Sequence, residues 1–199
     1  MAKRISAAFV VFALLVISAG FARTRVTARA ATRQSAAEAA AVKRGEYLVT
    51  IIDCGGCHTP LKMGAAGPEP DLDRYLSGHP EQMGPLPAAT TQRPWDWAGA
   101  GTNTAFSGPW GVTYTMNLTP DQNTGLGIWT EDMFVRALRT GKHMSVSRPI
   151  MPPMPWQAFR NATDEDLKAI YAYLRTIRPV VNHVPEWQPP AEVASLSGH

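Results

Sequence analysis

The stretch "IIDCGGCHTP", residues 51–60, decides how this sequence is interpreted, because it holds both cysteines of the chain and a histidine directly after the second. With only Cys54 and Cys57 present, a disulfide framework is excluded, since the one available bridge would close a four-residue loop. A structural zinc ion usually needs four protein ligands, and there is no second cysteine pair to supply them. A redox dithiol and a covalent haem anchor remain open.

The spacing of these three residues suits haem chemistry. Two thiols three residues apart on a tight turn can each add to one vinyl group of a haem, and an imidazole on the next residue then becomes the fifth ligand of the iron. The glycines at 55 and 56 would let the backbone pass close to the porphyrin edge. A redox dithiol normally sits in a βαβ setting, which this pattern lacks. The motif predicts one haem c attached through Cys54 and Cys57, with His58 on the iron.

The charge of the chain is unevenly distributed. The whole chain carries a formal charge of +3, but residues 1–30 hold five basic residues and no acid. Without them, 14 basic residues face 16 acidic ones, a net charge of −2. A nucleic-acid partner therefore has no electrostatic support. An acidic body with two further haem carboxylates is expected to dock on a basic partner surface.

The N-terminal stretch "MAKRISAAFVVFALLVISAGFA" has a short basic start and then an apolar run over 5–22, typical of a secretory signal. This run is long for a signal and near the minimum for a spanning helix, so a cleaved signal peptide and an uncleaved anchor both stay open. In either case we expect export and a periplasmic body. The body would be soluble, or held at the membrane through residues 5–22.

The pattern divides the chain into a signal peptide or anchor, a small-residue tether, one folded domain and an extended tail, at 1–30, 31–36, 37–180 and 181–199. Apolar periodicity predicts helices at about 37–51, 131–140 and 163–177. Thr130 and Thr163 are expected N-caps and Gly141 a C-terminal cap. Alternation over 110–119 indicates a short strand or hairpin arm.

Two long segments are expected to be irregular. Residues 59–109 are rich in Pro and Gly, with a helical turn predicted only at "DLDRYL" (71–76). The prolines of 147–156 exclude a helix there. Gly45 lies inside the first predicted helix, where glycine costs about 1 kcal/mol relative to alanine, so we expect it to pack closely against another element.

Four blocks carry a resemblance: "RGEYLVTIIDCGGCHTP" (44–60), "YLSGHP" (75–80), "MNLTPDQNTGLGIWTEDMFVRALRTGKH" (116–143) and "MPPMPWQAF…TDEDLKAIYAYLRTI" (151–177). With them the chain resembles a class I c-type cytochrome, of the bacterial periplasmic mono-haem kind that partners dehydrogenases. The resemblance implies a mainly α fold with crossing N- and C-terminal helices around one haem, long Pro/Gly-rich loops and a short hairpin. It places Gly45 at the crossing, beneath Ile170 and Tyr173.

The resemblance also implies the sixth iron ligand, Met154, held between Pro153 and Pro155. Met151 is the nearest competitor, Met116 and Met144 are more distant ones, and His79 or His143 would instead give a bis-histidine iron. Asn117 and Arg148 are weaker candidates for contacts with the haem propionates. Five aromatic residues are expected to line the haem pocket: Trp110, Trp129, Trp156, Tyr171 and Tyr173.

A histidine and a methionine on the iron raise its reduction potential and close it to small molecules. The sequence therefore predicts a non-enzymatic carrier of single electrons, with a dehydrogenase or a terminal oxidase or reductase as redox partner. Three alternatives stay open. They are a peroxidase-like haem enzyme with an open sixth site, an obligate cytochrome subunit of a membrane-associated dehydrogenase, and a thiol–disulfide protein.

Overall fold

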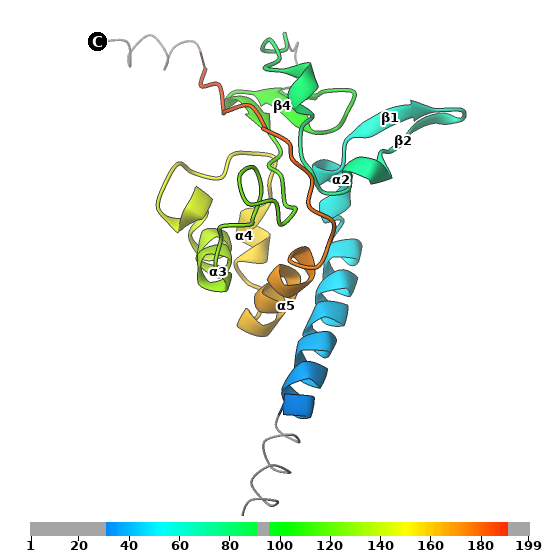
Figure 1. The fold of residues 1–199 in the computed structure, drawn as a ribbon. Helices are drawn as coiled ribbons and strands as arrows, with labels where there is room; N and C mark the ends of the chain where they lie inside the picture. The colour runs from blue at the N-terminus through cyan, green and yellow to red at the C-terminus, as the bar shows by residue number, and fades with distance from the viewer. Residues whose placement is uncertain (1–30, 91–95, 191–199) are drawn as a thin grey trace, which may run out of the picture. The chain divides into compact units, whose positions relative to one another are not determined.

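The computed structural model describes residues 31–90 and 96–190 (Figure 1). The chain divides into two compact units, residues 1–40 and 41–199. In the first unit the described residues, 31–40, are helical, which includes the segment expected as a tether. The predicted signal or anchor and the end of the predicted tail lie outside the described residues. Within the described ranges, no helix is both long and apolar enough to cross a membrane.

The second unit begins with a helix over 41–51, which leads directly into the turn that carries Cys54 and Cys57. The α-helices that follow are α2 (Cys54–His58), α3 (Glu131–Thr140), α4 (Trp156–Phe159) and α5 (Asp164–Leu174). Three short 3₁₀ turns join them: η1 (Leu72–Arg74), η2 (Glu81–Met83) and η3 (His143–Ser145). The strands are β1 (Leu61–Gly64), β2 (Gly67–Pro70), β3 (Ala98–Gly99), β4 (Ala105–Gly108) and β5 (Gly111–Tyr114).

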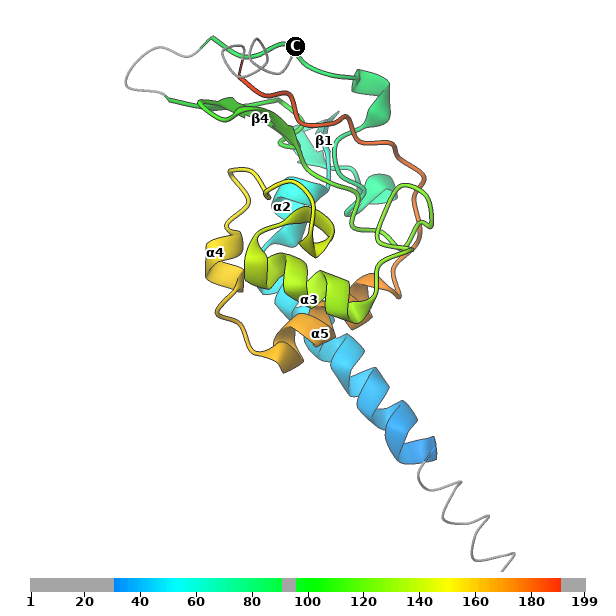
Figure 2. The same ribbon diagram turned by 90° about the vertical axis from the view of Figure 1, so that its left-hand side faces the viewer.

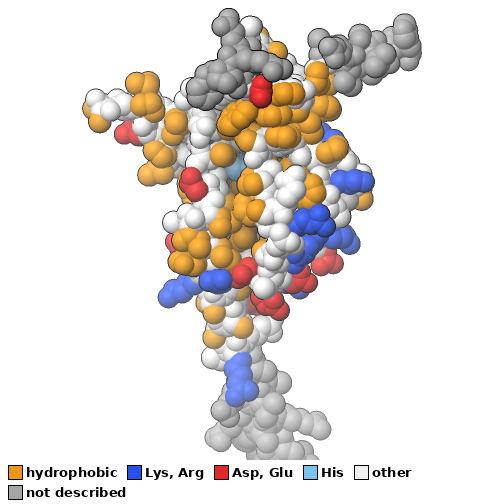
Figure 3. Space-filling model, turned by 180° about the vertical axis from the view of Figure 1, so that it is seen from behind, with side chains coloured by type: hydrophobic (Ala, Val, Ile, Leu, Met, Phe, Trp, Pro, Cys, Tyr) orange, Lys and Arg blue, Asp and Glu red, His pale blue; other side chains and the backbone are white. Residues whose placement is uncertain are grey.

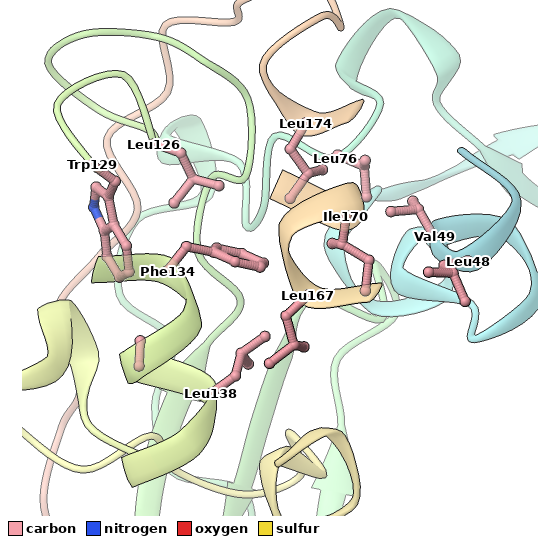
Figure 4. Close-up of a cluster of buried hydrophobic side chains, with 11 residues drawn as sticks. Leu48, Val49, Leu76, Leu126, Trp129, Phe134, Leu138, Leu167, Ile170 and Leu174 are labelled. Atoms are coloured by element: carbon pink, nitrogen blue, oxygen red, sulfur yellow. The ribbon is translucent and has the colours of Figure 1, made fainter. Parts of the chain in front are cut away.

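The helices of the second unit enclose one hydrophobic cluster, which we call the helical core (Figure 4). In Figure 2, α3 and α5 lie side by side, and their apolar faces meet in this cluster. Its buried members are Leu48, Val49, Leu76, Leu126, Trp129, Phe134, Ala137, Leu138, Leu167, Ile170 and Leu174. Burying large aliphatic and aromatic side chains contributes about 1.5–3 kcal/mol each, so this cluster is the main source of stability in the helical part.

The mid-helix glycine is explained by a backbone contact. A Cβ at Gly45 would lie 1.9 Å from the carbonyl oxygen of Ala169 and 2.8 Å from the Cβ of Tyr173 in α5. The expected close packing and the contact with Tyr173 are confirmed. The closest neighbour, however, is the backbone of Ala169 rather than Ile170, because without a side chain at 45 the two backbones themselves come into contact.

Both predicted N-caps are confirmed. The Thr130 hydroxyl accepts from Met133 N, and the Thr163 hydroxyl accepts from Asp166 N. Gly141 ends α3 with a left-handed φ of 68°, as the sequence predicted. The third helix ends at Leu174, short of the predicted 177. The one-turn helix α4 begins at Trp156, the last residue of the stretch 147–156 where no helix was expected, because Trp156 follows the final proline of that stretch.

The prediction that 59–109 is irregular except for one helical turn was wrong. Strands β1 and β2 pair as an antiparallel hairpin, and β3, β4 and β5 form a three-stranded antiparallel sheet. The strands are two to four residues long and lack alternation, so periodicity could not reveal them. The strand predicted within 110–119 is confirmed as β5.

The sheet has a small cluster of its own, which we call the sheet core, with Ala105, Val112 and Tyr114 buried. From α5 the chain runs extended over 178–190 along the sheet, orange to red in Figure 1. Gln188 forms a β-bridge with Val112, and Asn182 is buried. This segment therefore connects the helical core to the sheet core.

Candidate functional site

The two cysteines lie on one turn of helix. Asp53, the N-cap of α2, has a left-handed φ of 56°, and its carboxylate accepts from Gly56 N at 3.0 Å. A Cβ at Gly56 would lie 2.2 Å from Asp53 Oδ2, whereas one at Gly55 would make only ordinary contacts at 3.6 Å. Gly56 is therefore required by the cap itself. Cys54 and Cys57 are free thiols and half-buried, and both belong to α2.

His58 ends the turn, and its ring is held in one orientation. Its Nδ1 lies 2.9 Å from the carbonyl oxygen of Met116, so Nδ1 carries the proton and donates it. No hydrogen bond from the described residues reaches Nε2, which keeps its lone pair. Burial lowers the pKa of His58 below its ordinary value, and the bond to Met116 opposes this only partly. The ring is thus a neutral imidazole suited to binding a metal through Nε2.

A tight turn places the Met116 carbonyl. Gly78 N donates to His58 O at 2.8 Å, and His79 N donates to Thr115 O at 3.0 Å. Gly78 has a φ of 78°, and a Cβ there would lie 2.3 Å from Thr115 O. Only glycine fits this position, so the "SGH" turn holds 115–116 against the end of α2.

The thiols have the wrong acidity for disulfide exchange. Burial, helped by the negative charge of Asp53, raises the pKa of Cys54 to about 11. The same two causes raise the pKa of Cys57. Redox-active CxxC thiols need a lowered pKa to supply thiolate at neutral pH. The surroundings of these cysteines therefore disfavour the thiol–disulfide alternative.

Three of the four methionines considered for the iron lie at the edge of the helical core. Met154 is half-buried, packs against that core and follows the Pro152–Pro153 pair. Its carbonyl accepts from Trp156 N at 2.9 Å, which joins it to α4. Met144 and Met116 also pack against the helical core, whereas Met151 is half-buried outside it. Met116 contributes to the site through its backbone carbonyl.

The two histidines of the bis-histidine alternative lie in different surroundings. His79 is fully buried, with Nδ1 at 3.0 Å from Thr104 Oγ1 and its ring 4.9 Å from that of Tyr114. His143 belongs to η3, and its ring meets Trp129 edge-on at 5.3 Å. Burial lowers the pKa of both rings, and the charge of Arg148 lowers that of His143 further.

The residues suggested for haem propionates have other partners. The Asn117 amide donates to Thr124 Oγ1 and Val180 O, and its oxygen accepts both from Thr119 N and from Thr119 Oγ1. All its hydrogen-bonding capacity is used within the protein, so it fixes a loop. Arg148 is half-exposed and lies 3.9 Å from Glu186.

The aromatic residues expected around the haem lie in different parts of the fold. Trp129 is buried in the helical core, and Tyr171 and Tyr173 pack against it. Trp156 lies against Gly141, where a Cβ would come within 2.4 Å of its ring. Trp110 belongs to the β4–β5 turn, and its carbonyl accepts from Trp187 Nε1 at 2.8 Å.

Sequence reasoning missed the groups that position the site. The Asp53 cap had a local signal, an acidic residue directly before a helical turn. The Met116 carbonyl and the Asn103 amide, which donates to Gly56 O at 2.6 Å, had none, because both act across the fold. The groups present fit the donor set of a haem c: two thiols on one turn, a neutral imidazole with an open Nε2, and half-buried thioethers.

Comparisons with known proteins agree with this geometry. A family model described as cytochrome c matches residues 42–178. The fructose dehydrogenase cytochrome subunit of Gluconobacter japonicus is 31% identical over 150 residues, 75% of this chain and 24% of that protein. The gluconate 2-dehydrogenase cytochrome c subunit of Pantoea cypripedii is 32% identical over 152 residues, 76% of this chain and 26% of that protein.

A third relative is the cytochrome c subunit of the quinone alcohol dehydrogenase of Gluconobacter oxydans, 30% identical over 145 residues, 72% of this chain and 23% of that protein. The chain thus spans about a quarter of the length of these three relatives. The matched region contains α2, the SGH turn, the Met154 loop and α5. This chain belongs to the cytochrome c family, whose prosthetic group is haem c.

Proposed function

We propose that this chain carries single electrons through one covalently bound haem. Cys54 and Cys57 would hold the haem, His58 would be the fifth ligand of the iron and Met154 the sixth. The observation that carries the proposal is the orientation of His58, which shares α2 with both thiols: its Nδ1 donates to Met116 O, and its Nε2 stays open. When bound, the haem supplies an iron that alternates between two oxidation states.

The chain's own residues would set how that iron behaves. The Met116 carbonyl fixes the tautomer and ring plane of His58, and a hydrogen bond of this kind also raises ligand basicity. Pro153 and Pro155 limit how far the Met154 sulfur can swing, because proline fixes φ. In this reading the helix over 41–51 and α5 are the crossing N- and C-terminal helices of the class I fold, with Gly45 and Ala169 at the contact.

The redox partner we propose is a dehydrogenase. The relatives above are named as cytochrome subunits of fructose, gluconate and quinone alcohol dehydrogenases. Because this chain matches only about a quarter of each, it corresponds to one cytochrome module of such a subunit. We also propose that residues 1–30 direct export to the periplasm, as signal peptide or anchor, that 31–36 act as the tether before the 37–180 domain, and that 181–199 form its tail.

The test compares absorption spectra of the oxidised and reduced protein, expressed with c-type haem maturation. We expect covalent haem together with the weak long-wavelength band of a methionine–iron bond. Met154→Ala should lose that band and gain carbon monoxide binding, whereas Met151→Ala, a matched change three residues away, should keep it. If the unchanged protein lacks the band and binds carbon monoxide, the closed-iron carrier is refuted and the haem enzyme takes its place.

A further inference from the structure

The loop that carries Met154 is attached to a helix at each end. At its start, Ile150 N donates to Gly141 O at 2.7 Å, so this part is closed onto the end of α3. At its far end, Trp156 N donates to Met154 O at 2.9 Å, which joins the loop to α4. The segment 151–154 lies between these two attachments and needs a contact of its own to hold it in place.

The segment 151–154 has few backbone groups that could form such a contact. Pro152 and Pro153 have no N–H, so neither can donate to a neighbouring element. Among the described residues, one hydrogen bond joins this segment to an element other than its own loop and α4. It runs from the Thr113 hydroxyl to the carbonyl oxygen of Pro152, over 2.9 Å. The hydrogen-bonded link between this segment and the sheet is therefore a single threonine side chain.

The pleat of β5 explains why Thr113 points at this loop. Side chains alternate between the two faces of a strand, and Val112 and Tyr114 both lie in the sheet core. Thr113 lies between them in the sequence and points to the opposite face, where it is only 7% exposed. In Figures 1 and 2 the loop between α3 and α4, drawn in yellow tones, rises toward the sheet before it returns to α4, in agreement with the bond to Pro152.

The Thr113 hydroxyl has one proton and two acceptors near it. Pro152 O lies at 2.9 Å, and Phe106 O, on the paired strand β4, lies at 3.3 Å. The first distance is within the usual range for an O–H donor and the second is outside it, so the proton is directed to Pro152. A valine at this position would fill the same space and leave the Pro152 carbonyl without its donor.

This hydrogen bond lies where the sheet part meets the helical part. Its Thr113 end is buried, its Pro152 end is exposed, and Met154 beyond it is half-buried against the helical core. On the side of the molecule drawn in Figure 3, hydrophobic side chains continue from the sheet part down to the helical part. A buried hydroxyl without a partner is unfavourable, so Thr113 favours the loop position in which the Pro152 carbonyl accepts its proton.

The same strand also positions the proposed fifth ligand. β5 leads directly to Met116, whose carbonyl accepts from His58 Nδ1. β5 is held on both edges, by β4 and by Gln188, which exchanges two hydrogen bonds of 2.9 Å with Val112. A strand fixed in this way is a rigid support for a site. Thr113 and Met116, three positions apart, therefore connect one rigid element to both proposed ligands of the iron.

We propose that Thr113 is a positioning residue for the sixth iron ligand: its hydroxyl fixes the Pro152 carbonyl and so keeps the Met154 loop closed over the iron. This inference rests on the proposed function, in which Met154 is that ligand. Thr113 acts through the loop backbone and is not a ligand itself. The sheet part, which carries none of the proposed ligands, thus controls how readily the iron opens to small molecules.

The test measures imidazole binding to the oxidised holoprotein, since imidazole binds only after the Met154 sulfur has left the iron. The apparent affinity for imidazole therefore rises with the fraction of molecules whose loop is open. A neutral hydrogen bond favours the closed loop by a factor of about three to ten, so we expect Thr113→Val to raise the imidazole affinity by about that factor. The long-wavelength methionine–iron band of this variant should also disappear on heating well before its helices unfold.

Two matched variants separate this hydrogen bond from a general loss of stability. Thr113→Ser keeps the hydroxyl and should restore the imidazole affinity of the unchanged protein. Ser107→Ala removes a hydroxyl of the same sheet that accepts from Ala89 N at 2.9 Å, on the same face as Val112. It should lower Tm without changing the imidazole affinity. If Thr113→Val carries no haem, Thr113→Ala takes its place in the same comparison, because it adds no methyl group where the hydroxyl was.

The failures are distinguishable. If Met154→Ala keeps the long-wavelength band, Met154 is not the ligand and the proposed function fails. If Met154→Ala loses the band but Thr113→Val binds imidazole no more tightly than the unchanged protein, only the role of Thr113 is refuted. That role is also refuted if Thr113→Ser behaves like Thr113→Val, or if Ser107→Ala raises the affinity equally, because the bond from the hydroxyl to Pro152 is then not the cause.

Discussion

The helical core and the sheet core of this chain are built in different ways. In the helical part, α3 and α5 each begin at a threonine cap and carry an apolar face, so each helix is specified within its own residues. In the sheet part, the strands are two to four residues long, pair with their neighbours in the sequence, and are tied by hydrogen bonds to residues far along the chain. The Tyr114 hydroxyl, for example, accepts from Leu86 N and from Gln188 Nε2, both at 2.7 Å.

This difference predicts which substitutions each part tolerates least. Helices packed on one another depend on shape, so the position with no room for a side chain is the most sensitive one. A small sheet held by remote polar contacts depends on every buried donor and acceptor keeping its partner. Substitutions in the two parts should therefore lower the stability of the protein for different reasons.

The largest effect is expected at Gly45. In Gly45→Ala the new Cβ would overlap the Ala169 carbonyl, so the helix over 41–51 must move away from α5. We expect the free energy of unfolding of the holoprotein to fall by about 3 kcal/mol, measured by guanidinium unfolding. Gly101→Ala is the matched control, since nothing lies within 4 Å of that site, and an equal loss there would show that shape complementarity is not the cause.

The corresponding test of the remote polar contacts is Asn182→Ala, in the extended segment 178–190. The Asn182 amide donates to Ser77 O at 2.7 Å and to His79 O at 2.8 Å, and its oxygen accepts from Glu81 N at 2.9 Å. Removing it leaves these backbone groups without partners, at a cost of about 2 kcal/mol. Hydrogen exchange should then speed up around 77–81 before it does in α5.

Asn161→Ala controls for the loss of an asparagine, because Asn161 is exposed and bonds only to Gln157 O within its own turn. Its effect should stay within about 0.5 kcal/mol. Equal protection of 77–81 in Asn182→Ala and the unchanged protein would mean that the Asn182 side chain does not hold the SGH turn in place.

A smaller effect is expected at the cap of α5. Thr163→Ala removes the hydroxyl that accepts from Asp166 N at 3.1 Å and should lower the free energy of unfolding by about 1 kcal/mol. Thr163→Ser keeps the oxygen and should recover most of the loss. If alanine and serine behave alike, the cap hydrogen bond does not stabilise α5.

The smallest effect concerns the ion pair beside Gly45. Arg44 Nε lies 2.9 Å from Asp166 Oδ1, and the hydrogen bond from Arg44 holds the pKa of Asp166 below its ordinary value. A lowered carboxyl pKa stabilises the fold above the unfolded pKa of about 3.9, and that stability is lost as the pH falls through the folded value.

Arg44→Gln should therefore lower the free energy of unfolding slightly at pH 7 and reduce its loss below about pH 4. Urea unfolding at a series of pH values measures this, with Lys43→Gln as the control for removing a neighbouring exposed cation. If the free energy of unfolding of Arg44→Gln falls with pH below about pH 4 as steeply as that of the unchanged protein, the ion pair is fully screened by solvent.

The sequence by itself predicted the features that depend on neighbouring residues. The helix at 131–140, its cap at Thr130, its end at Gly141 and the cap at Thr163 follow from caps and periodicity acting within one or two turns. The same holds for Cys54, Cys57 and His58 as one chemical unit, because three functional residues within the five positions of one turn need no distant partner to be recognised.

Only the tertiary structure revealed what acts across the chain. Gly45 needed close packing, but its contact with the Ala169 backbone depends on how two helices meet 124 residues apart. The Met116 carbonyl that orients His58 and the short strands within 59–109 both depend on residues with no local signal. Propensity and periodicity extend over a few residues, whereas these contacts form only when the whole chain is packed.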